Sequence, residues 1–409
     1  MKAKAISEQL PSTWTTCNLK YLATAQKGRL AQEPTSAPIS KDDVPYLSME
    51  YLRGETTMPG YISLGSEPLL ADDGDILLLW DGSNAGEFLR AKRGAVSSTA
   101  ALLVPSGIDR DFFYWACKAA ESALRAETVG MGIPHVNGVV LGLLKLPIPP
   151  MPEQLKIADL LAKEAAMLDV LIGEKENLLG LLTEKRRTVV TRAVIRGLNP
   201  DAPLRDSDSP WLGQIPKHWE TRRIAVLFRE RDEREEPELP LLEVSINTGV
   251  VLREFSEDRI ENTASDFNTY KVARKGDVVF NKMRMWQGAV GIAPEDGLVS
   301  PDYTVAEPVG KLSSDYAGQL FRADMFSAEC ARHSHGIVWD RLRIYWDGFR
   351  DIVVPVPPFA EQRAIVAHIQ KETSKLDTLQ VAAERTIGLL KERRAALITE
   401  AVTGKIKID

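Results

Sequence analysis

The chain has 409 residues, 44% of them hydrophobic, and a formal net charge of −6 at pH 7. A chain of this length can bury a sizeable core and form two or three domains. The acidic balance argues against a protein that holds nucleic acid mainly through its own phosphate contacts, because such a protein needs a basic face.

Three further features of the sequence exclude particular classes of protein. The most apolar run, DILLLW from Asp75 to Trp80, has the length of a strand and not of a membrane span. The N-terminal residues lack the apolar core of a signal peptide. The three cysteines lie far apart without a CxxC motif, so neither a disulfide framework nor a zinc site is predicted. We therefore expect a cytoplasmic protein without a metal or cofactor.

In chain order, each half shows short apolar runs separated by turn residues. In the first half, residues 75–80 and 100–105 predict strands, and residues 111–127 predict a helix. In the second half, residues 277–280 and 302–308 predict strands. Each half is therefore predicted to contain a mixed α+β domain of about 140 residues.

The chain contains one unit written twice. At an offset of 208 residues (356 − 148), residues 146–194 align without a gap to residues 354–402. The shared phrase PxPPxxEQ contains IPPMPEQ from Ile148 and VPPFAEQ from Val356. Two copies are fewer than the three or so that a solenoid needs. The repeat therefore predicts two globular units in tandem, each followed by a helix.

Each repeated phrase predicts the start of a long helix. Its prolines cannot continue a helix backwards, so the chain turns into a helix near Glu153 and again near Glu361. The helix dipole favours a carboxylate in the first turn. Each helix is expected to run for about 40 residues, which corresponds to roughly 60 Å.

The two helices carry related apolar seams, which predict an antiparallel coiled coil. A parallel pair would place Glu164 beside Glu372, and like charges in a seam repel. An antiparallel pair instead brings Glu164 to Arg394 and Arg186 to Glu372. The alternative is that these four residues flank the seam and face solvent or a partner subunit.

The predicted seam is centred on Lys175 in the first helix and Ala383 in the second, and it includes Leu171 and its repeat partner Leu379. Gly180 and Gly388 are expected beside it, where they would permit close approach of the helices. Each glycine costs ~1 kcal/mol in helix propensity.

Motifs for catalysis are missing from the sequence. It contains no P-loop, and GMGIPH at Gly130 does not match GxGxxG. His333 and His335 lack a third candidate metal ligand nearby, so a turn or a polar contact is expected there. VPPF at Val356 lacks the polar first residue of an amino-methyltransferase motif, and PDYTVAE at Pro301 lacks the correctly spaced lysine of a nuclease. The chain is therefore expected not to be an enzyme.

Two loops at equivalent positions, after Gly74-Asp75 and after Gly276-Asp277, carry side chains suited to base edges. Arg and Lys can bond guanine, and Asn and Gln can bond adenine, in the major groove. The candidate DNA-binding residues are Ser83, Asn84, Lys92, Arg93, Asn281, Lys282, Arg284, Trp286 and Gln287. A solvated hairpin without a ligand is the alternative for each loop.

Three stretches together resemble the specificity subunit of type I restriction-modification systems. They are the PxPPxxEQ phrase, LLKERRAALITEAVTGKI from Leu389, and GLNPDAPLRDSDSPWLGQIPKHWE between the halves. The resemblance covers essentially the whole chain. It implies two target recognition domains, each reading half of a bipartite asymmetric DNA site, and two antiparallel helices that set the gap between the half-sites.

The resemblance also implies partners: double-stranded DNA, two modification (methyltransferase) subunits and two restriction (motor and nuclease) subunits. The expected fold class is α+β, with two mixed α/β recognition domains in pseudo-two-fold tandem. The expected ranges are 1–146 and 214–353 for the recognition domains, 147–198 and 354–409 for the spacer helices, and 199–213 for a linker. A recognition subunit of another methylation or phage-defence complex, or a coiled-coil scaffold without DNA binding, remain as alternatives.

Overall fold

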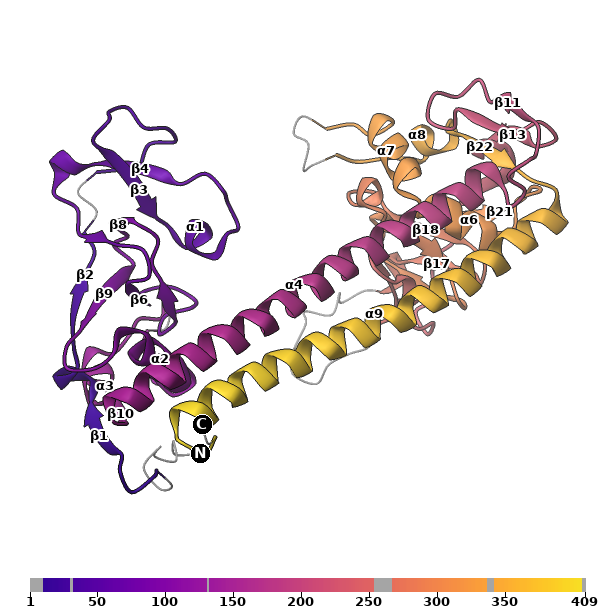
Figure 1. Ribbon diagram of the computed structural model, residues 1–409. Helices are drawn as coiled ribbons and strands as arrows, with labels where there is room; N and C mark the ends of the chain where they lie inside the picture. Colours follow the sequence, from indigo (N-terminus) through magenta and orange to yellow (C-terminus); the bar gives the residue numbers. More distant parts are fainter. Residues whose placement is uncertain (1–9, 30–31, 131, 254–266, 337–341, 407–409) are drawn as a thin grey trace. The chain divides into compact units, whose positions relative to one another are not determined.

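The computed structural model describes residues 10–29, 32–130, 132–253, 267–336 and 342–406. The chain divides into two compact units (Figure 1): unit 1 contains Met1–Glu176 and Arg385–Asp409, and unit 2 contains Asn177–Glu384. The boundary passes through both long helices, so each unit contains a globular part and a segment of each helix. The outer ends of the first and last predicted ranges, 1–9 and 407–409, lie outside the described residues.

Unit 1 is a mixed α/β fold. Its strands are β1 (Thr15–Asn18), β2 (Ala23–Lys27), β3 (Asp43–Leu47), β4 (Gly60–Ser63), β5 (Leu70–Ala71), β6 (Ile76–Leu79), β7 (Phe88–Arg90), β8 (Gly94–Val96), β9 (Ala100–Pro105) and β10 (Lys145–Ile148). Its helices are α1 (Met49–Arg53), α2 (Arg110–Ala126), α3 (Gly138–Leu143) and the first part of α4 (Met151–Arg196), with 3-10 turns η2 (Leu19–Tyr21) and η3 (Leu64–Ser66). The sheets have the strand orders β2-β9-β6-β7, β4-β3-β8-β5 and β1-β10.

Unit 2 is also mixed α/β. Its strands are β11 (Leu204–Asp206), β12 (Gln214–Pro216), β13 (Glu220–Arg223), β14 (Phe228–Arg231), β15 (Leu242–Ser245), β16 (Gly249–Leu252), β17 (Lys271–Ala273), β18 (Val278–Asn281), β19 (Val290–Ile292), β20 (Gly297–Val299), β21 (Tyr303–Pro308) and β22 (Val353–Val356). Its helices are α5 (Ile224–Leu227), α6 (Ser314–Phe321), α7 (Asp324–Arg332), α8 (Trp346–Arg350) and most of α9 (Phe359–Val402), with 3-10 turns η4 (Phe267–Thr269) and η5 (Met285–Gln287). Its four-stranded sheet has the order β14-β21-β18-β19, and β11-β12, β13-β22, β15-β16 and β17-β20 form two-stranded sheets.

The two units share a scaffold. The four-stranded sheets of the two units are antiparallel throughout and equivalent in topology. The strands β2, β9, β6 and β7 of unit 1 correspond, in this order across the sheet, to β14, β21, β18 and β19 of unit 2. In each unit an early strand also pairs with the strand directly before a long helix, as β1-β10 and as β13-β22. The predicted mixed α/β class is confirmed, and the strands and the helix predicted in the globular halves are present.

One inner strand of each four-stranded sheet, β6 in unit 1 and β18 in unit 2, is buried on both faces, which explains its unbroken apolar sequence. In β6, Ile76 and Leu78 pack into the core that contains α2, whereas Leu77 packs with Leu47 and Val96 on the other face. β18 repeats the arrangement with Val278 and Phe280 on one face and Val279 on the other.

A tryptophan from each globular part binds the start of a long helix. The indole Nε1 of Trp14 donates to Glu153 Oε2 at 2.8 Å, and Nε1 of Trp219 donates to Glu361 Oε2 at 2.8 Å. Both glutamates stand in the first turn of their helix, as the repeated phrase predicts. The phrase therefore occurs twice because the same joint, a tryptophan of the globular part bound to a first-turn glutamate of the long helix, is formed in both units.

The glutamine that follows each glutamate makes the second contact of the joint. Gln154 accepts a hydrogen bond from the backbone N–H of Asp109 at 2.8 Å, and Gln362 accepts one from Ser313 at 2.8 Å. Asp109 and Ser313 are the N-caps of α2 and α6. Both glutamines are buried, so each long helix begins against the start of a domain helix.

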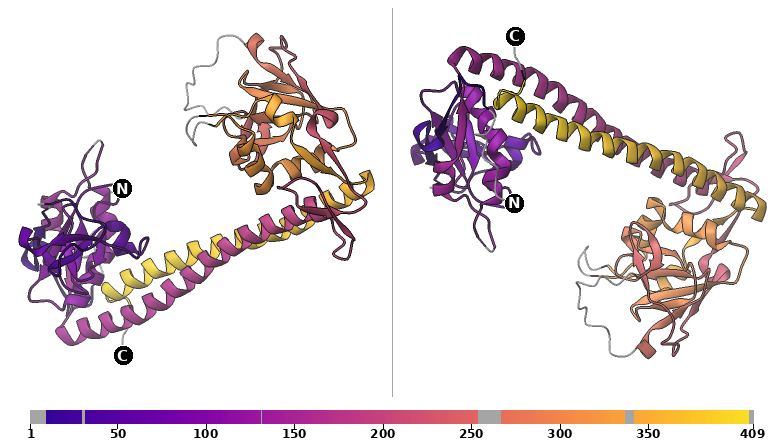
Figure 2. Two further views of the ribbon diagram at one scale, coloured as in Figure 1. Left: turned by 90° about the horizontal axis from the view of Figure 1, so that it is seen from above. Right: turned by 90° about the horizontal axis from the view of Figure 1, so that it is seen from below.

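In each unit the α4 and α9 segments lie side by side in all views (Figures 1 and 2) and run antiparallel. In unit 1, Asp169 pairs with Arg394, and seven residues later Glu176 pairs with Lys391. In unit 2, Arg186 pairs with Asp377. None of the helices in the described part of the chain has the length and hydrophobicity required to span a membrane.

The predicted charge partners of the two arginines are wrong. Arg394 contacts Asp169 instead of Glu164, and Arg186 contacts Asp377 instead of Glu372, a shift of five residues in each case. Glu372 pairs within its own helix, with Lys375. The shift arises because burying a carboxylate is costly. Uncharged neighbours therefore occupy the interface.

Burial along the helices shows which positions those are. Ala165 and Ile172 are buried, whereas Leu171 of the predicted seam is exposed, as is its repeat partner Leu379. At these two points of α4, the buried residue is the one that follows the predicted seam residue. The charged groups consequently flank the interface, which was the stated alternative.

The role predicted for the two helix glycines is also wrong. A Cβ atom built on Gly180 or on Gly388 would meet no atom within 4 Å, so neither glycine provides a close approach between helices. Both positions are exposed. A side chain at either position would therefore not clash with the neighbouring helix.

The segment predicted as a linker, 199–213, folds as part of unit 2. Its strand β11 pairs with β12, and Trp211 and Leu212 are buried in the core. The indole of Trp211 donates to the carbonyl of Val353 at 3.1 Å. The segment is rich in Pro, Asp and Ser, and these residues occupy turns between the anchored ones.

Replacing Gly180 or Gly388 with alanine should raise the free energy of unfolding by about 1 kcal/mol each, because alanine favours the helix and meets no neighbour. Chemical denaturation of the purified chain measures this. Gly291→Ala is the control, since its Cβ would lie 2.5 Å from the backbone nitrogen of Val250 and should destabilise the fold. A loss of stability in both helix variants would show that the glycines have a packing role.

Candidate nucleic-acid interface

In unit 2, five predicted DNA-binding residues stand in one segment, residues 281–289, which begins with the last residue of β18 and forms the loop to β19. Asn281 Oδ1 accepts a hydrogen bond from the backbone N–H of Met283 at 2.9 Å. Trp286 Nε1 donates to the carbonyl of Met283 at 2.9 Å. Gly288, with a φ of 88°, closes the turn. Asn281 and Trp286 therefore hold the shape of the loop.

The other three predicted residues of this loop present their side chains outward. Arg284 and Gln287 are exposed, and Lys282 is half-buried. None of the three forms an ion pair within the described residues. Their guanidinium, amide and ammonium groups can therefore reach a ligand without breaking an intramolecular ion pair.

The base of the loop is neutral at ordinary pH. Tyr303 stands opposite Asn281 in the β18–β21 ladder. Burial raises the pKa of Tyr303 above its ordinary value, although a side-chain hydrogen bond with Asn281 opposes the shift. The phenol thus stays protonated and uncharged at ordinary pH.

In unit 1 the equivalent loop, residues 80–87, joins β6 to β7. Ser83 is exposed, whereas Asn84 accepts a hydrogen bond from Arg125 at the end of α2 at 3.1 Å. Asp81 pairs with Lys27 at 2.6 Å. The loop occupies the same position as the 281–289 loop but presents different chemistry.

Lys92 and Arg93 do not join Ser83 and Asn84. They follow β7, at the other end of the β6–β7 hairpin. The ammonium of Lys92 lies 4.1 Å from the ring centroid of Tyr51 and donates to its carbonyl. Arg93 is exposed, and its backbone N–H donates to Asp73. The structure thus divides the four residues predicted in unit 1 into two separate places.

The Gly-Asp pair before each central strand has a structural role. Gly74 and Gly276 have φ values of 83° and 91°, which favour glycine. Asp75 accepts a hydrogen bond from the N–H of Asp72, and Asp277 accepts one from Arg274, both at 2.9 Å. These turns lie at the strand end opposite the 80–87 and 281–289 loops.

Around Asp277 the charges neutralise one another. Arg231 contacts both Asp277 and Glu307 at 2.7 Å, and Arg274 contacts Asp296 at 3.0 Å. Burial raises the pKa of Asp277, while the bonds from Arg274 and Arg231 oppose the shift. Arg231 and Arg274 at this end of the sheet are therefore already paired with carboxylates, in contrast to Arg284 at the other end.

A second loop packs on each candidate loop, and sequence reasoning missed it. In unit 1, the N–H of Gly82 donates to Pro134 O at 2.9 Å. In unit 2, the N–H of Ile344 donates to Lys282 O at 3.0 Å, and Arg343 contacts the Met283 sulfur at 3.4 Å. Both loops follow a domain helix and contain a histidine-rich or glycine-rich phrase. The occurrence of such a phrase after a domain helix in both halves is the sequence feature from which this second loop could have been predicted.

Of the two histidines in the second loop of unit 2, His333 makes the polar contact that was expected, and His335 takes part through its backbone. His333 Nε2 lies 3.3 Å from Glu329 Oε1 on α7. The backbone of His335 forms an isolated bridge with Arg343. Residues 337–341 of this loop lie outside the described residues.

Comparison with known proteins identifies the relatives of this chain. The family model for the type I restriction modification DNA specificity domain matches residues 11–177. The type I restriction enzyme MjaVIII specificity subunit of Methanocaldococcus jannaschii is 24% identical over 384 residues, covering 89% of this chain and 86% of the relative. The EcoDI specificity subunit of Escherichia coli is 19% identical over 360 residues, covering 82% and 78%.

A solved structure described as the basis of complex assembly and conformational transition of the type I R-M system shares the fold. It aligns with a TM-score of 0.69 at 15% identity, over 97% of this chain and 100% of that chain. The predicted resemblance to type I specificity subunits is therefore confirmed.

Arg284→Ala should weaken binding to specific DNA by about 1–3 kcal/mol, because a bidentate contact with guanine is worth that much. Thermal stability should not change, since the side chain is exposed. Fluorescence anisotropy with the recognised duplex measures the affinity.

Lys275→Ala is the matched control for this experiment. It removes one exposed positive charge at the opposite end of β18 and should leave specific affinity nearly unchanged. Equal losses in both variants would show that Arg284 contributes general charge and not base recognition.

Proposed function

We propose, on the premise that this chain is a relative of the type I specificity subunits, that it recognises the DNA sequence for a type I restriction-modification complex. Each globular part reads one half of a bipartite, asymmetric site. The long helices form an antiparallel coiled coil that sets the gap between the half-sites. The chain itself is not catalytic and works in the cytoplasm.

One observation carries this proposal: a shared scaffold presents two different loops at the same position. The 80–87 loop joins β6 to β7 and the 281–289 loop leads from β18 to β19, the corresponding neighbouring strands of two equivalent four-stranded sheets. A common scaffold allows a common approach to the DNA, and different side chains at its tip allow different bases to be read. An asymmetric site follows from these two properties together.

The partners in this proposal are two modification (methyltransferase) subunits and two restriction (motor and nuclease) subunits. Exposed leucines on the helices support docking of two equivalent subunits. Leu171 and Leu389 belong to unit 1, and Leu181 and Leu379 belong to unit 2; the 208-residue repeat exchanges the two pairs. Exposed apolar side chains are suited to an interaction surface, and their recurrence in both units would provide two equivalent docking places.

Replacing residues 1–145 with another recognition domain should change one half-site and leave the other unchanged. The donor domain must supply a tryptophan at position 14 and a helix N-cap at position 109, because these residues bind Glu153 and Gln154. Methylation mapping in a host that carries the complex measures both half-sites. A swap that changes both half-sites, or neither, would contradict independent reading. Loss of all methylation in every swap and in the unmodified complex would favour a scaffold role.

The helices should act as a ruler for the gap between the half-sites. Inserting seven residues into each helix, after Glu176 and after Glu384, preserves the apolar periodicity and lengthens each by ~10.5 Å. The recognised gap should then grow by about three base pairs at ~3.4 Å each. Insertion into one helix alone is the control and should disrupt pairing. An unchanged gap with full methylation would assign the spacing to the modification subunits.

A further inference from the structure

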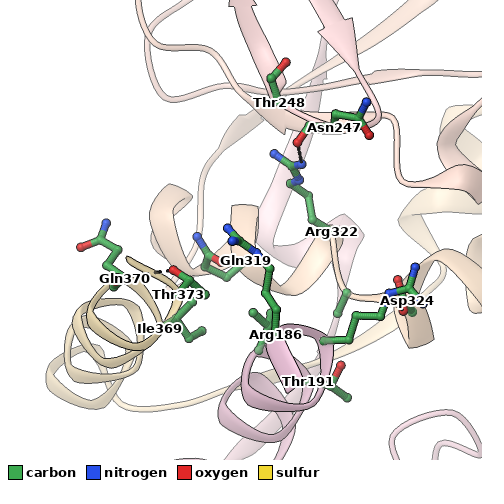
Figure 3. Close-up of a pocket in the computed structure, with 13 residues that line it drawn as sticks. Arg186, Thr191, Asn247, Thr248, Gln319, Arg322, Asp324, Ile369, Gln370 and Thr373 are labelled. Atoms are coloured by element: carbon green, nitrogen blue, oxygen red, sulfur yellow. Dashed lines mark hydrogen bonds and ion pairs between the residues drawn. The ribbon is translucent and has the colours of Figure 1, made fainter. Parts of the chain in front are cut away.

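Unit 2 contains a cavity of about 400 Å³ between α4, α9 and the corner that joins α6 to α7 (Figure 3). Three arginines line it: Arg186 and Arg187 from α4, and Arg322 from the corner. The close-up places Gln319, Gln370 and Thr373 around the same space. The lining therefore combines guanidinium groups with neutral amide and hydroxyl groups.

The positive charge of this cavity exceeds the negative charge that contacts it. Arg187 pairs with Asp324 at 3.2 Å, and Arg186 pairs with Asp377, which does not line the cavity. Arg322 contacts only carbonyl oxygens, those of residues 246 and 247, among its described hydrogen bonds. Three guanidinium groups thus face two carboxylates, and one positive charge is left over.

The environment of Arg322 is consistent with this excess. Burial lowers the pKa of Arg322, and the nearby charge of Arg186 lowers it further. The pair between Arg187 and Asp324 is exposed, and such pairs contribute little. Arg187 can therefore exchange its carboxylate for an incoming anion at small cost. Guanidinium groups match the oxygens of a phosphate in bidentate geometry.

The cavity adjoins the candidate loop of the same unit. Asp324 lines the arginine cavity and also a second hollow formed with Trp286 and Gln287 of the 281–289 loop. A duplex that contacts this loop would have its backbone close to the arginines. We propose, resting on the proposed function, that Arg186, Arg187 and Arg322 form a pocket for a phosphate group of the DNA backbone beside the half-site read by unit 2.

The repeat provides an internal contrast. The repeat partner of Arg186 is Arg394, whereas the partner of Arg187 is Ala395. Arg394 lines a cavity of unit 1 that contains four aspartates, including Asp109 and Asp169, beside Arg90. That cavity disfavours an anion. The phosphate pocket is therefore a property of unit 2 alone.

The test uses the full chain assembled with its modification subunits, and the recognised duplex at several salt concentrations. Arg187→Gln and Arg322→Gln should each weaken matched and mismatched DNA alike. Each should reduce the slope of log affinity against log salt by about 1, the effect of losing one phosphate contact. Arg394→Gln is the control: it removes an arginine that lines the aspartate-rich cavity of unit 1, together with its ion pair to Asp169, and should leave the slope unchanged.

Duplexes with one neutral methylphosphonate linkage then locate the phosphate. One position next to the unit 2 half-site should weaken wild-type binding and have no effect in Arg187→Gln. Specific binding with a wild-type slope in both variants, or no linkage coupled to Arg187, would overturn the pocket and leave the proposed function intact. Loss of all site preference in the wild-type complex would overturn both.

An experiment with inorganic phosphate and no DNA distinguishes a pocket for a DNA phosphate from a pocket for a free phosphate ion. If phosphate alone raises the melting temperature of the wild-type chain but not of Arg187→Gln, while the salt slopes agree, the pocket binds a free anion. That result would overturn its assignment to DNA. Equal thermal responses together with a reduced slope in the variants would support the assignment.

Discussion

The hydrogen bond between a domain tryptophan and a first-turn glutamate determines how this protein is built. It joins Trp14 to Glu153 and Trp219 to Glu361 at the same distance of 2.8 Å. Hydrogen bonds to a charged group contribute about 1.5–3 kcal/mol each. The neighbouring glutamines add a second, buried contact to the start of α2 or α6. Two fixed points at the first turn leave each long helix little freedom to change direction.

The same tryptophans also meet the end of the other long helix. The ring of Trp14 lies against Gly404, which follows α9, and the ring of Trp219 lies against Gly197, which follows α4. Both glycines have a positive φ, 72° at Gly197 and 71° at Gly404, as is common after a helix. Each tryptophan therefore connects the beginning of one helix with the end of the other. An antiparallel arrangement within each unit is the direct consequence.

This construction separates support from recognition. The joints, the four-stranded sheets and the Gly-Asp turns recur in both units, whereas the loops at the opposite strand ends differ. Asn281 and Trp286 use their polar groups to shape their loop, which leaves Arg284 and Gln287 free to face outward. Side chains at such tips can vary without disturbing the joints. In the proposed function, each unit can therefore read its own half-site without any change in the joints.

The sequence by itself determined the repeat, the strands β6, β9, β18 and β21, the helix α2, and the start and great length of α4 and α9. These features depend on local periodicity and on proline and glycine positions, which a single segment contains. It also located the 281–289 loop, because its residues are contiguous. The tertiary structure alone decided which charges pair between the helices. Register depends on the summed burial of both helices: Ala165 is buried in place of Glu164, whose carboxylate would be costly to bury, and Ile172 is buried in place of Leu171. The arginine pocket was invisible in the sequence for a similar reason: Arg186 and Arg322 stand 136 residues apart (322 − 186), and only folding brings them to one cavity.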